Sequence, residues 1–170
     1  MSKEKKKILF LVAHRLGRSP GQRFRFEQYL DYLGQNGFEC HISNLIDERD
    51  DADFYAKGKY LAKFRIFIKS FWRRLQDLRR LKEYHAVFLY REAFMLGNIF
   101  FEKAIHRRHV PMILDFDDSI WLHDVSIGNK NLGWLKDPLK TEKIIRLCDL
   151  VIVCNQYLAD YALRYNPNVH

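Results

Sequence analysis

Short apolar runs alternate with longer amphipathic stretches along the chain. Runs rich in Val, Ile, Leu and Phe predict buried strands at residues 7–13, 38–45, 86–92, 110–116 and 149–155. The stretches between them have helical spacing and predict helices at residues 21–37, 57–82, 94–108, 140–147 and 156–164. Strands that alternate with helices are typical of βαβ units, and near-continuous apolar strands fit a sheet covered on both faces. The pattern therefore predicts an α/β fold, with a doubly wound, mostly parallel sheet and helices on both faces, in a single domain over residues 1–170.

Ligands of open parallel sheets bind beyond the carboxyl ends of the strands. This rule selects residues 14–25, 44–53, 91–94 and 115–124 as the segments that carry function. Within the second of them, the acidic sequence DERDDAD (residues 47–53) has no apolar periodicity and is predicted to be a solvated loop.

The segment after the first strand, HRLGRSPGQRFRFEQYL, contains Gly17 and Gly21 but neither GxGxxG nor GxxxxGK[ST]. A dinucleotide or P-loop fingerprint is therefore absent. A turn with glycine that enters a helix suits an anionic group through free N–H donors. Arg23 and Arg25 are predicted in the first helical turn, where cations oppose the helix dipole. That placement favours a functional use, and ordinary surface arginines remain the alternative.

The sequence LDFDDSIWLHD follows the fourth predicted strand and concentrates aspartates. Asp115 and Asp117 form a DxD, and with Asp118 and Ser119 they loosely match the aspartyl-phosphatase pattern DxDx[TV], which normally follows the first strand. Facing carboxylates could bind Mg²⁺. Equally, Asp118 or Ser119 could cap a short helix over residues 120–122.

Three further polar residues lie at the same predicted edge. His123 could donate a hydrogen bond or act as a base. Arg91 and Glu92 directly follow the third strand. They could contact a ligand or form a structural ion pair, and the sequence leaves both readings open.

The stretch from Tyr55 to Lys82 contains ten basic residues and one acid. Its apolar positions are three or four residues apart: Leu61, Phe64, Ile68, Phe71, Leu75 and Leu78. Most of the bases fall on the opposite side, including Lys63, Arg65, Lys69 and Arg73, which we expect to face an anionic membrane surface. The alternative is a crossover helix that packs its apolar stripe on the sheet and leaves its charges in water. No nucleic-acid reader motif accompanies the helix, so no nucleic-acid partner is expected.

The composition of the chain restricts the class of protein, the cellular compartment and the charge of a partner. The chain of 170 residues is 48% apolar and 15% aromatic, which argues against disorder. It has no apolar run of about 18 residues, so no spanning helix is expected, and its first apolar run is interpreted as a strand and not as a signal peptide. Three widely spaced cysteines match no zinc or disulfide pattern and favour a reducing cytoplasm. The formal net charge of +8 predicts attraction to an anionic partner.

Several stretches together resemble the N-terminal half of a GT-B glycosyltransferase of family 4. They are KILFLVAHRLGRSPGQRFRFEQYLDYLGQNGFE, VFLYREA, ILDFDDSIW and CDLVIVCNQYLADYALRYNPNV, which cover essentially the whole chain. The resemblance implies a Rossmann-like acceptor-side domain, one half of a GT-B fold, from a retaining enzyme of cell-surface polysaccharide synthesis. The nucleotide-sugar donor would be bound mainly by a second domain with an E-x7-E arrangement, which these residues do not contain. A strand of the family would begin near His170, and this chain alone is expected to fold without transferase activity.

The resemblance also assigns roles to particular residues. The turn at Gly17 and Gly21 corresponds to the glycine turn that approaches the donor diphosphate, although the paired glycines of many members are missing. The other residues are expected to line the acceptor side, with His123 and Asp118 as catalytic candidates and Arg23, Arg25, Arg91, Glu92 and Asp117 as acceptor-binding residues. No metal and no cofactor besides the nucleotide-sugar co-substrate is implied. The expected acceptor is a glycan or a lipid-linked glycan, at a cytoplasmic location with peripheral association at the inner membrane face. The alternatives are a stand-alone α/β binding or regulatory module and a Mg²⁺-dependent phosphatase that uses Asp115 and Asp117.

Overall fold

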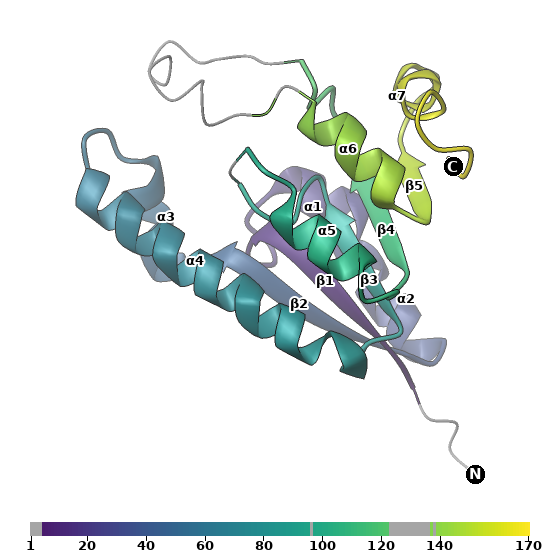
Figure 1. Cartoon of the computed structure of the whole chain (residues 1–170). Coiled ribbons are helices and arrows are strands. Elements are labelled where there is room, and N and C mark those ends of the chain that lie inside the picture. The colour runs from purple at the N-terminus through teal and green to yellow at the C-terminus, as the bar shows by residue number, and fades with distance from the viewer. Residues whose placement is uncertain (1–4, 96, 123–136, 138) are drawn as a thin grey trace.

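The protein is described by a computed structural model that covers residues 5–95, 97–122, 137 and 139–170. These residues form a parallel five-stranded sheet with the order β2-β1-β3-β4-β5 (Figure 1). The strands are β1 (Lys6–His14), β2 (Phe38–Ile46), β3 (Ala86–Tyr90), β4 (Met112–Phe116) and β5 (Leu150–Val153). Each pairs with its neighbours in parallel. The predicted doubly wound, Rossmann-like α/β fold is confirmed.

Helices cover both faces of this sheet. They are α1 (Pro20–Arg25), α2 (Leu30–Gln35), α3 (Glu48–Tyr55), α4 (Tyr60–Arg80), α5 (Phe100–His106), α6 (Lys140–Leu147) and α7 (Gln156–Ala162), with 3-10 turns η1 (Glu27–Tyr29) and η2 (Leu81–Glu83). In Figure 1, α4, α5 and α6 lie in front of the sheet, and α1 and α2 lie behind it. None of the helices in the described ranges is long and apolar enough to cross a membrane.

Alternation along β1 supplies both halves of the core. Leu9 and Leu11 belong to the larger cluster on the side of α4 and α5, whereas Phe10 and Val12 belong to a second cluster with Phe26. All of these side chains are at most 3% exposed. Successive side chains of a strand point to opposite faces, so one apolar run fills two cores.

The helix predicted at residues 21–37 is interrupted. The backbone at Phe26 has φ −142° and ψ −33°, which ends α1 and lets the ring pack 5.3 Å from Phe10 and 5.7 Å from Phe88. The free energy gained by burying the Phe26 ring therefore exceeds the free energy lost by interrupting the helix. Because α1 has only six residues, Arg23 and Arg25 lie in its last turn, where cations suit the helix dipole. The inference drawn from an unfavourable first-turn placement is therefore wrong.

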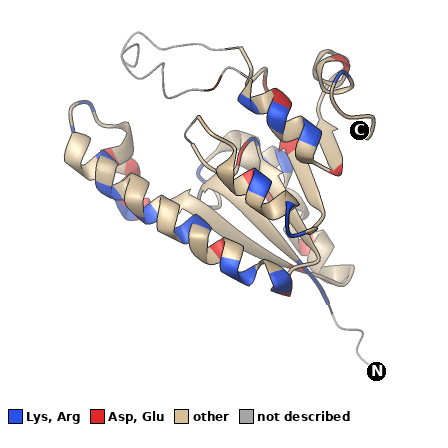
Figure 2. Cartoon of the chain, in the orientation of Figure 1, with Lys and Arg blue, Asp and Glu red and all other residues tan. Residues whose placement is uncertain are grey.

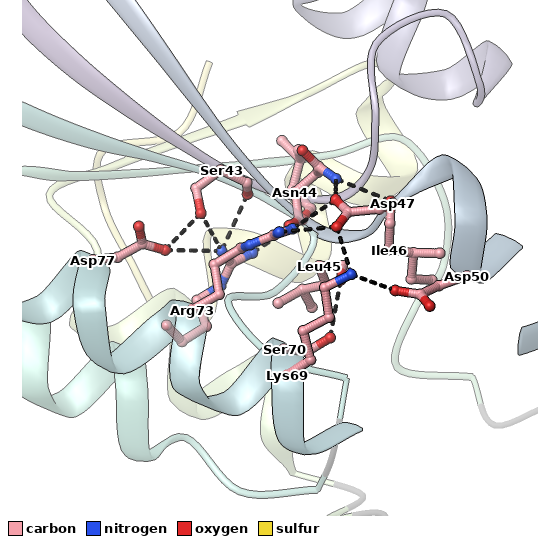
Figure 3. A network of polar contacts seen from close by, with 12 residues as sticks. Ser43, Asn44, Leu45, Ile46, Asp47, Asp50, Lys69, Ser70, Arg73 and Asp77 are labelled. Atoms are coloured by element: carbon pink, nitrogen blue, oxygen red, sulfur yellow. Dashed lines mark hydrogen bonds and ion pairs between the residues drawn. The ribbon is translucent and has the colours of Figure 1, made fainter. Parts of the chain in front are cut away.

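The acidic stretch at residues 47–53 is not a solvated loop, because most of it forms α3. Asp50 is 3% exposed and accepts hydrogen bonds from Lys69 at 2.6 Å and Arg65 at 3.2 Å. Asp47, which precedes α3, accepts two hydrogen bonds from Arg73 at 2.9 and 3.0 Å (Figure 3). The acids and the basic row of α4 therefore neutralise one another, which fixes α3 against α4.

Arg74 of α4 is the largest fully buried side chain among the described residues. Its guanidinium donates to the carbonyl oxygens of Val12 at 3.0 Å, Ser43 at 3.1 Å and Ala93 at 2.6 Å, and to the Asp77 carboxylate at 3.0 Å. The three carbonyl acceptors lie near the ends of β1 and β2 and just after β3, whereas Asp77 lies on α4 itself. Burial lowers the pKa of Arg74 to about 10, so the side chain stays charged at neutral pH. The neighbourhood of Ser43 and Asp77 is drawn in Figure 3.

The last residues run beside β5. Val169 forms an isolated parallel bridge with Val151, and the His170 amide donates to the Val151 carbonyl at 2.9 Å. Residues 169 and 170 thus lie parallel to β5.

Candidate functional site at the sheet crevice

The order of the strands reverses between β1 and β3. β1 pairs with β2 on one side and β3 on the other, and the chain leaves the two inner strands toward opposite faces. Ligands of such sheets bind at this switch point, beyond the carboxyl ends of the strands. We use "crevice" only as a name for the residues gathered at these strand ends: His14, Gly17, Gly21, Tyr90, Arg91, Asp117 and Asp118.

Arg91 directly follows β3 in an unusual backbone conformation. Its φ of 69° is in the left-handed region, which is uncommon for an arginine. Its amide donates to the Asp115 carbonyl at 2.8 Å, and its guanidinium donates to Asp117 Oδ1 from Nε at 3.1 Å and Nη2 at 2.9 Å. Strained backbone of this kind is typical of functional sites. The side chain is still 40% exposed, so it can also donate to a ligand.

Asp117 is held from two sides. The hydroxyl of Tyr90, a residue that is 5% exposed, donates to Asp117 Oδ1 at 2.9 Å, beside the bonds from Arg91. Burial acts to raise the pKa of Asp117, but the Arg91 hydrogen bonds and charge and the Tyr90 hydroxyl lower it below the ordinary value. The side chain is 22% exposed. Asp117 therefore presents a fixed, ionised carboxylate at the crevice.

Gly21 lies against this pair. A methyl group added there would stand 2.8 Å from Asp117 Oδ2 and would overlap the Tyr90 hydroxyl. The glycine is thus required for close packing of α1 on the polar cluster. Gly17 has φ 75°, and its amide donates to Glu27 Oε2 at 2.8 Å. The donor expected to be free for an anion is therefore used by an acid of the same chain.

Asp115 and Arg25 form a separate, largely enclosed pair. Arg25 donates from Nε at 2.9 Å and from Nη2 at 2.8 Å to the two oxygens of Asp115, whose side chain is 2% exposed. Burial raises the pKa of Asp115, and Arg25 acts against it. The geometry is that of a bidentate structural ion pair, so Arg25 is directed into the fold and not toward an acceptor.

His14 lies at the end of β1 with one ring nitrogen unpaired. Its Nε2 is 3.1 Å from the Tyr55 hydroxyl, whereas its buried Nδ1 has no hydrogen-bond partner among the described residues. Burial, and then the positive charge of Arg18, lower the pKa of His14, and the charge of Arg91 acts in the same direction. The imidazole is therefore neutral at pH 7, and its unpaired Nδ1 is enclosed by the protein.

The remaining predicted residues are less involved. Asp118 is 74% exposed and accepts a hydrogen bond from the Ser119 amide at 2.8 Å, within a turn and not a helix over the described residues up to 122. Glu92 pairs with Lys140 of α6 at 2.7 Å. Arg23 is exposed, with no ion pair in the described part of the chain. His123 lies outside the described residues.

The predicted membrane-facing bases divide in two groups. Arg65, Lys69 and Arg73 are paired with Asp47 or Asp50, as described above. Lys63 is half-buried and forms no ion pair with a described carboxylate. Three of the four positions are therefore occupied by contacts with α3 and the residue before it.

The structure does not gather a metal site from the residues it describes: no three His, Cys, Asp or Glu side chains come together there. The DxD carboxylates are each bound by an arginine instead. Sequence reasoning did not identify His14 and Tyr90, although the parity of β3, which places Phe88 and Tyr90 on one face, was a usable signal for the second.

No protein-family model matches the chain, and a comparison with curated proteins returns no match.

Proposed function

We propose that the chain is the acceptor-side half of a retaining GT-B glycosyltransferase. It would bind a glycan or lipid-linked glycan whose hydroxyl receives a sugar from a nucleotide sugar. The resemblance of the sequence motifs supports this proposal. The observation that carries it is the crevice, where Arg91, Asp117 and Asp118 offer a charged donor and two carboxylate acceptors at the switch point of the sheet.

Sugar acceptors are recognised through hydroxyl groups, which both donate and accept hydrogen bonds. Asp117 is fixed by Tyr90 and Arg91, so it can accept from a hydroxyl without first being ordered. Arg91, whose side chain is 40% exposed, supplies a donor. In a retaining transfer, the anomeric carbon exchanges its bond to the diphosphate oxygen for a bond to the acceptor oxygen, and the proton of the acceptor hydroxyl passes to the departing diphosphate. We assign these residues to positioning that hydroxyl, with Asp118 and His123 as the candidates that touch it.

Acceptor binding by this chain can be measured directly by saturation-transfer NMR with a panel of alkyl glycosides. Asp117→Asn removes a charged acceptor, and we expect binding to weaken by about tenfold or more. Asp160→Asn on α7, an exposed aspartate bonded only to Gln156 in the described structure, is the matched control and should bind normally. Absence of saturation transfer from every glycoside, or equal binding by both variants, would refute acceptor binding at the crevice.

Transfer itself is tested on the product of the complete reading frame. Radiolabelled nucleotide hexoses are supplied with glycolipid acceptors, and label in the lipid fraction is counted. We expect transfer that Asp117→Asn reduces and Asp160→Asn leaves unchanged.

A stand-alone α/β binding module is the second candidate. The order β2-β1-β3-β4-β5 is also that of flavodoxin-like and receiver-like domains. Binding of a free nucleotide or flavin by the chain, without glycoside binding, would favour it. A phosphatase that uses Asp115 as nucleophile is disfavoured, because Arg25 binds both oxygens of that carboxylate.

A further inference from the structure

β2 is an edge strand of the sheet, and half of its backbone groups point away from β1. The Lys6 amide of β1 donates to the Gly37 carbonyl, and the His85 amide donates to the Lys7 carbonyl. Even-numbered residues of β1 therefore bond to odd-numbered residues of β2. Since the backbone groups of successive residues in a strand alternate in direction, the even-numbered residues of β2 direct their N–H and C=O groups outward.

The chain itself closes only the carboxyl end of this edge. Arg73 of α4 donates to the outward carbonyl of Asn44, and the Asn44 side-chain amide donates to the Ile46 carbonyl at 3.0 Å. Among the described residues, no hydrogen-bond partner meets the outward backbone groups of three further positions: Phe38, Cys40 and Ile42. Unpaired edge groups of this kind form a template for another strand. We call residues 38–42 the open edge.

β2 lacks the features that commonly protect an edge strand, which are lysine, proline and a bulge. Its sequence FECHISNLI contains no Lys and no Pro, and Glu39 is its single Asp, Glu, Lys or Arg. Its pairing with β1 keeps one register from Phe38 to Asn44. Figure 2 shows charged positions concentrated on α3 and α4, whereas β2 is tan over most of its length. Nothing in the strand therefore opposes the approach of another strand.

We propose that the open edge joins two copies of the chain through antiparallel pairing of β2 with the partner's β2. A two-fold axis at Cys40 places Phe38 opposite the partner's Ile42 and Cys40 opposite the partner's Cys40. Directly opposite residues of such a pair exchange both of their backbone hydrogen bonds, so every outward group of the open edge finds a partner. An axis at Ile42 would instead require the Asn44 carbonyl, which Arg73 already binds.

The side chains match one another in the register centred on Cys40. On the face covered by α2, where Cys40 and Ile42 pack on the smaller core cluster, apolar Phe38 meets apolar Ile42. On the face covered by α4, the Glu39 carboxylate meets the partner's His41 imidazole. These two side chains are 43% and 30% exposed, and within one copy they already contact each other. Each carboxylate would thus lie between two imidazoles, and matched cross-strand pairs of both kinds stabilise a sheet.

The open edge lies in the amino-terminal part of β2, whereas the crevice lies beyond the carboxyl ends of the strands. The inference therefore does not depend on the proposed sugar transfer, and failure of one leaves the other standing.

Cysteine cross-linking tests the register. Opposite residues in a hydrogen-bonded antiparallel pair have Cα atoms about 5.5 Å apart, within the span of about 4.4–6.8 Å that a disulfide bridges. In a Cys154→Ser background, which removes the exposed thiol, copper phenanthroline should give a covalent dimer through Cys40. The matched control adds Cys40→Ser and Ile42→Cys to that background. Its two new thiols would lie about 14 Å apart along the paired strands, so it should stay monomeric.

Sedimentation equilibrium in reducing buffer measures the non-covalent dimer, which we expect to grow with protein concentration. Ile42→Pro removes an outward N–H that the chain does not use itself, and it should raise the dissociation constant by about tenfold or more. Glu39→Lys, at an exposed position, should raise it by about fivefold, because a base then faces His41. Addition of His41→Glu to Glu39→Lys restores an acid opposite a base and should restore most of the affinity.

Asp160→Lys on α7 is the control for the acid-to-base change and should dimerise as the wild type does, because Asp160 is exposed and lies outside β2. Unchanged urea midpoints would show that the variants are folded. A wild-type chain that is monomeric at every concentration would overturn the proposal. A dimer that survives both Ile42→Pro and Glu39→Lys, or that Asp160→Lys weakens equally, would also overturn it. Cross-linking through Ile42→Cys but not through Cys40 would refute the register.

Discussion

Replacement of the buried Arg74 by methionine is expected to remove much of the stability of the domain. Methionine has a similar length but cannot donate, so the carbonyl oxygens of Val12, Ser43 and Ala93 lose the hydrogen bonds from Arg74. Asp77 Oδ2 loses its cationic partner and keeps only the Ser43 hydroxyl as a donor, at 2.7 Å. Removal of one partner of a buried ion pair typically costs about 3–5 kcal/mol. We expect a loss in that range, since relief of the arginine's own desolvation offsets part of the lost hydrogen bonds.

Urea unfolding followed by circular dichroism measures this loss. With a slope of about 2 kcal/mol per molar urea, the midpoint should fall by about 2 M. The matched control is Arg80→Met on the same helix, because Arg80 is 56% exposed and also pairs with a carboxylate three residues on, that of Glu83. Exposed pairs contribute at most about 1 kcal/mol, so this variant should unfold near the wild-type midpoint. If Arg74→Met loses no more stability than Arg80→Met, the structural role assigned to the buried guanidinium is wrong.

Other changes test the crevice and the acidic helix. Gly21→Ala should cost about 1–3 kcal/mol by overpacking, whereas Gly34→Ala, whose methyl meets nothing within 4 Å, should be neutral or stabilising; equal midpoints in urea would contradict the close packing. Tyr90→Phe should cost about 1 kcal/mol and raise the pKa of Asp117, followed by carboxyl NMR; an unchanged titration would mean that the hydroxyl does not stabilise the carboxylate. The Arg73 hydrogen bonds lead the interactions that lower the pKa of Asp47 below its ordinary 3.8, although burial opposes them. The stability that the Asp47 carboxylate contributes is therefore present above about pH 4 and lost as the pH falls further. Asp47→Asn should flatten the acid side of a plot of unfolding free energy against pH, and an unchanged slope there would contradict this role of Asp47.

The strands could be predicted because burial on both faces of the sheet requires a nearly continuous run of apolar residues in the sequence. Each predicted strand is present, although those at residues 86–92, 110–116 and 149–155 are shorter than expected. The interruption of the helix after β1 could not be predicted from the sequence, because only the tertiary packing of Phe26 on Phe10 and Phe88 explains it. Local spacing cannot reveal a ring that pulls the backbone out of a helix.

The prediction of a solvated loop at residues 47–53 was wrong for a related reason. α3 contains acids where an amphipathic helix would have apolar residues, and Asp50 is buried by bases from α4 and not by a hydrophobic core. Periodicity of apolar residues does not detect a helix that packs through charges. The stripe predicted on α4 also divides: Leu61, Phe64 and Ile68 face outward, whereas Leu78 faces the sheet, because α4 crosses the sheet and its contact line moves around the helix.

The location of the candidate site could be predicted from the sequence, but the pairing of its side chains could not. The rule for parallel sheets selected the correct strand ends. Asp115 and Arg25 are 90 positions apart, so no local pattern indicates that one neutralises the other. Arg91 and Asp117 likewise meet only through the pairing of β3 with β4.

The contacts of Arg74 have a consequence for local motion. The Arg74 guanidinium donates hydrogen bonds to carbonyl oxygens on β1, on β2 and after β3. The carboxyl ends of these strands therefore cannot separate from the sheet one at a time. Opening of any of them requires α4 to leave the sheet, which exposes a charged group and its carbonyl partners together. The floor of the crevice and the long helix therefore belong to a single cooperative unit, whose amide protons should exchange with solvent at one common, slow rate.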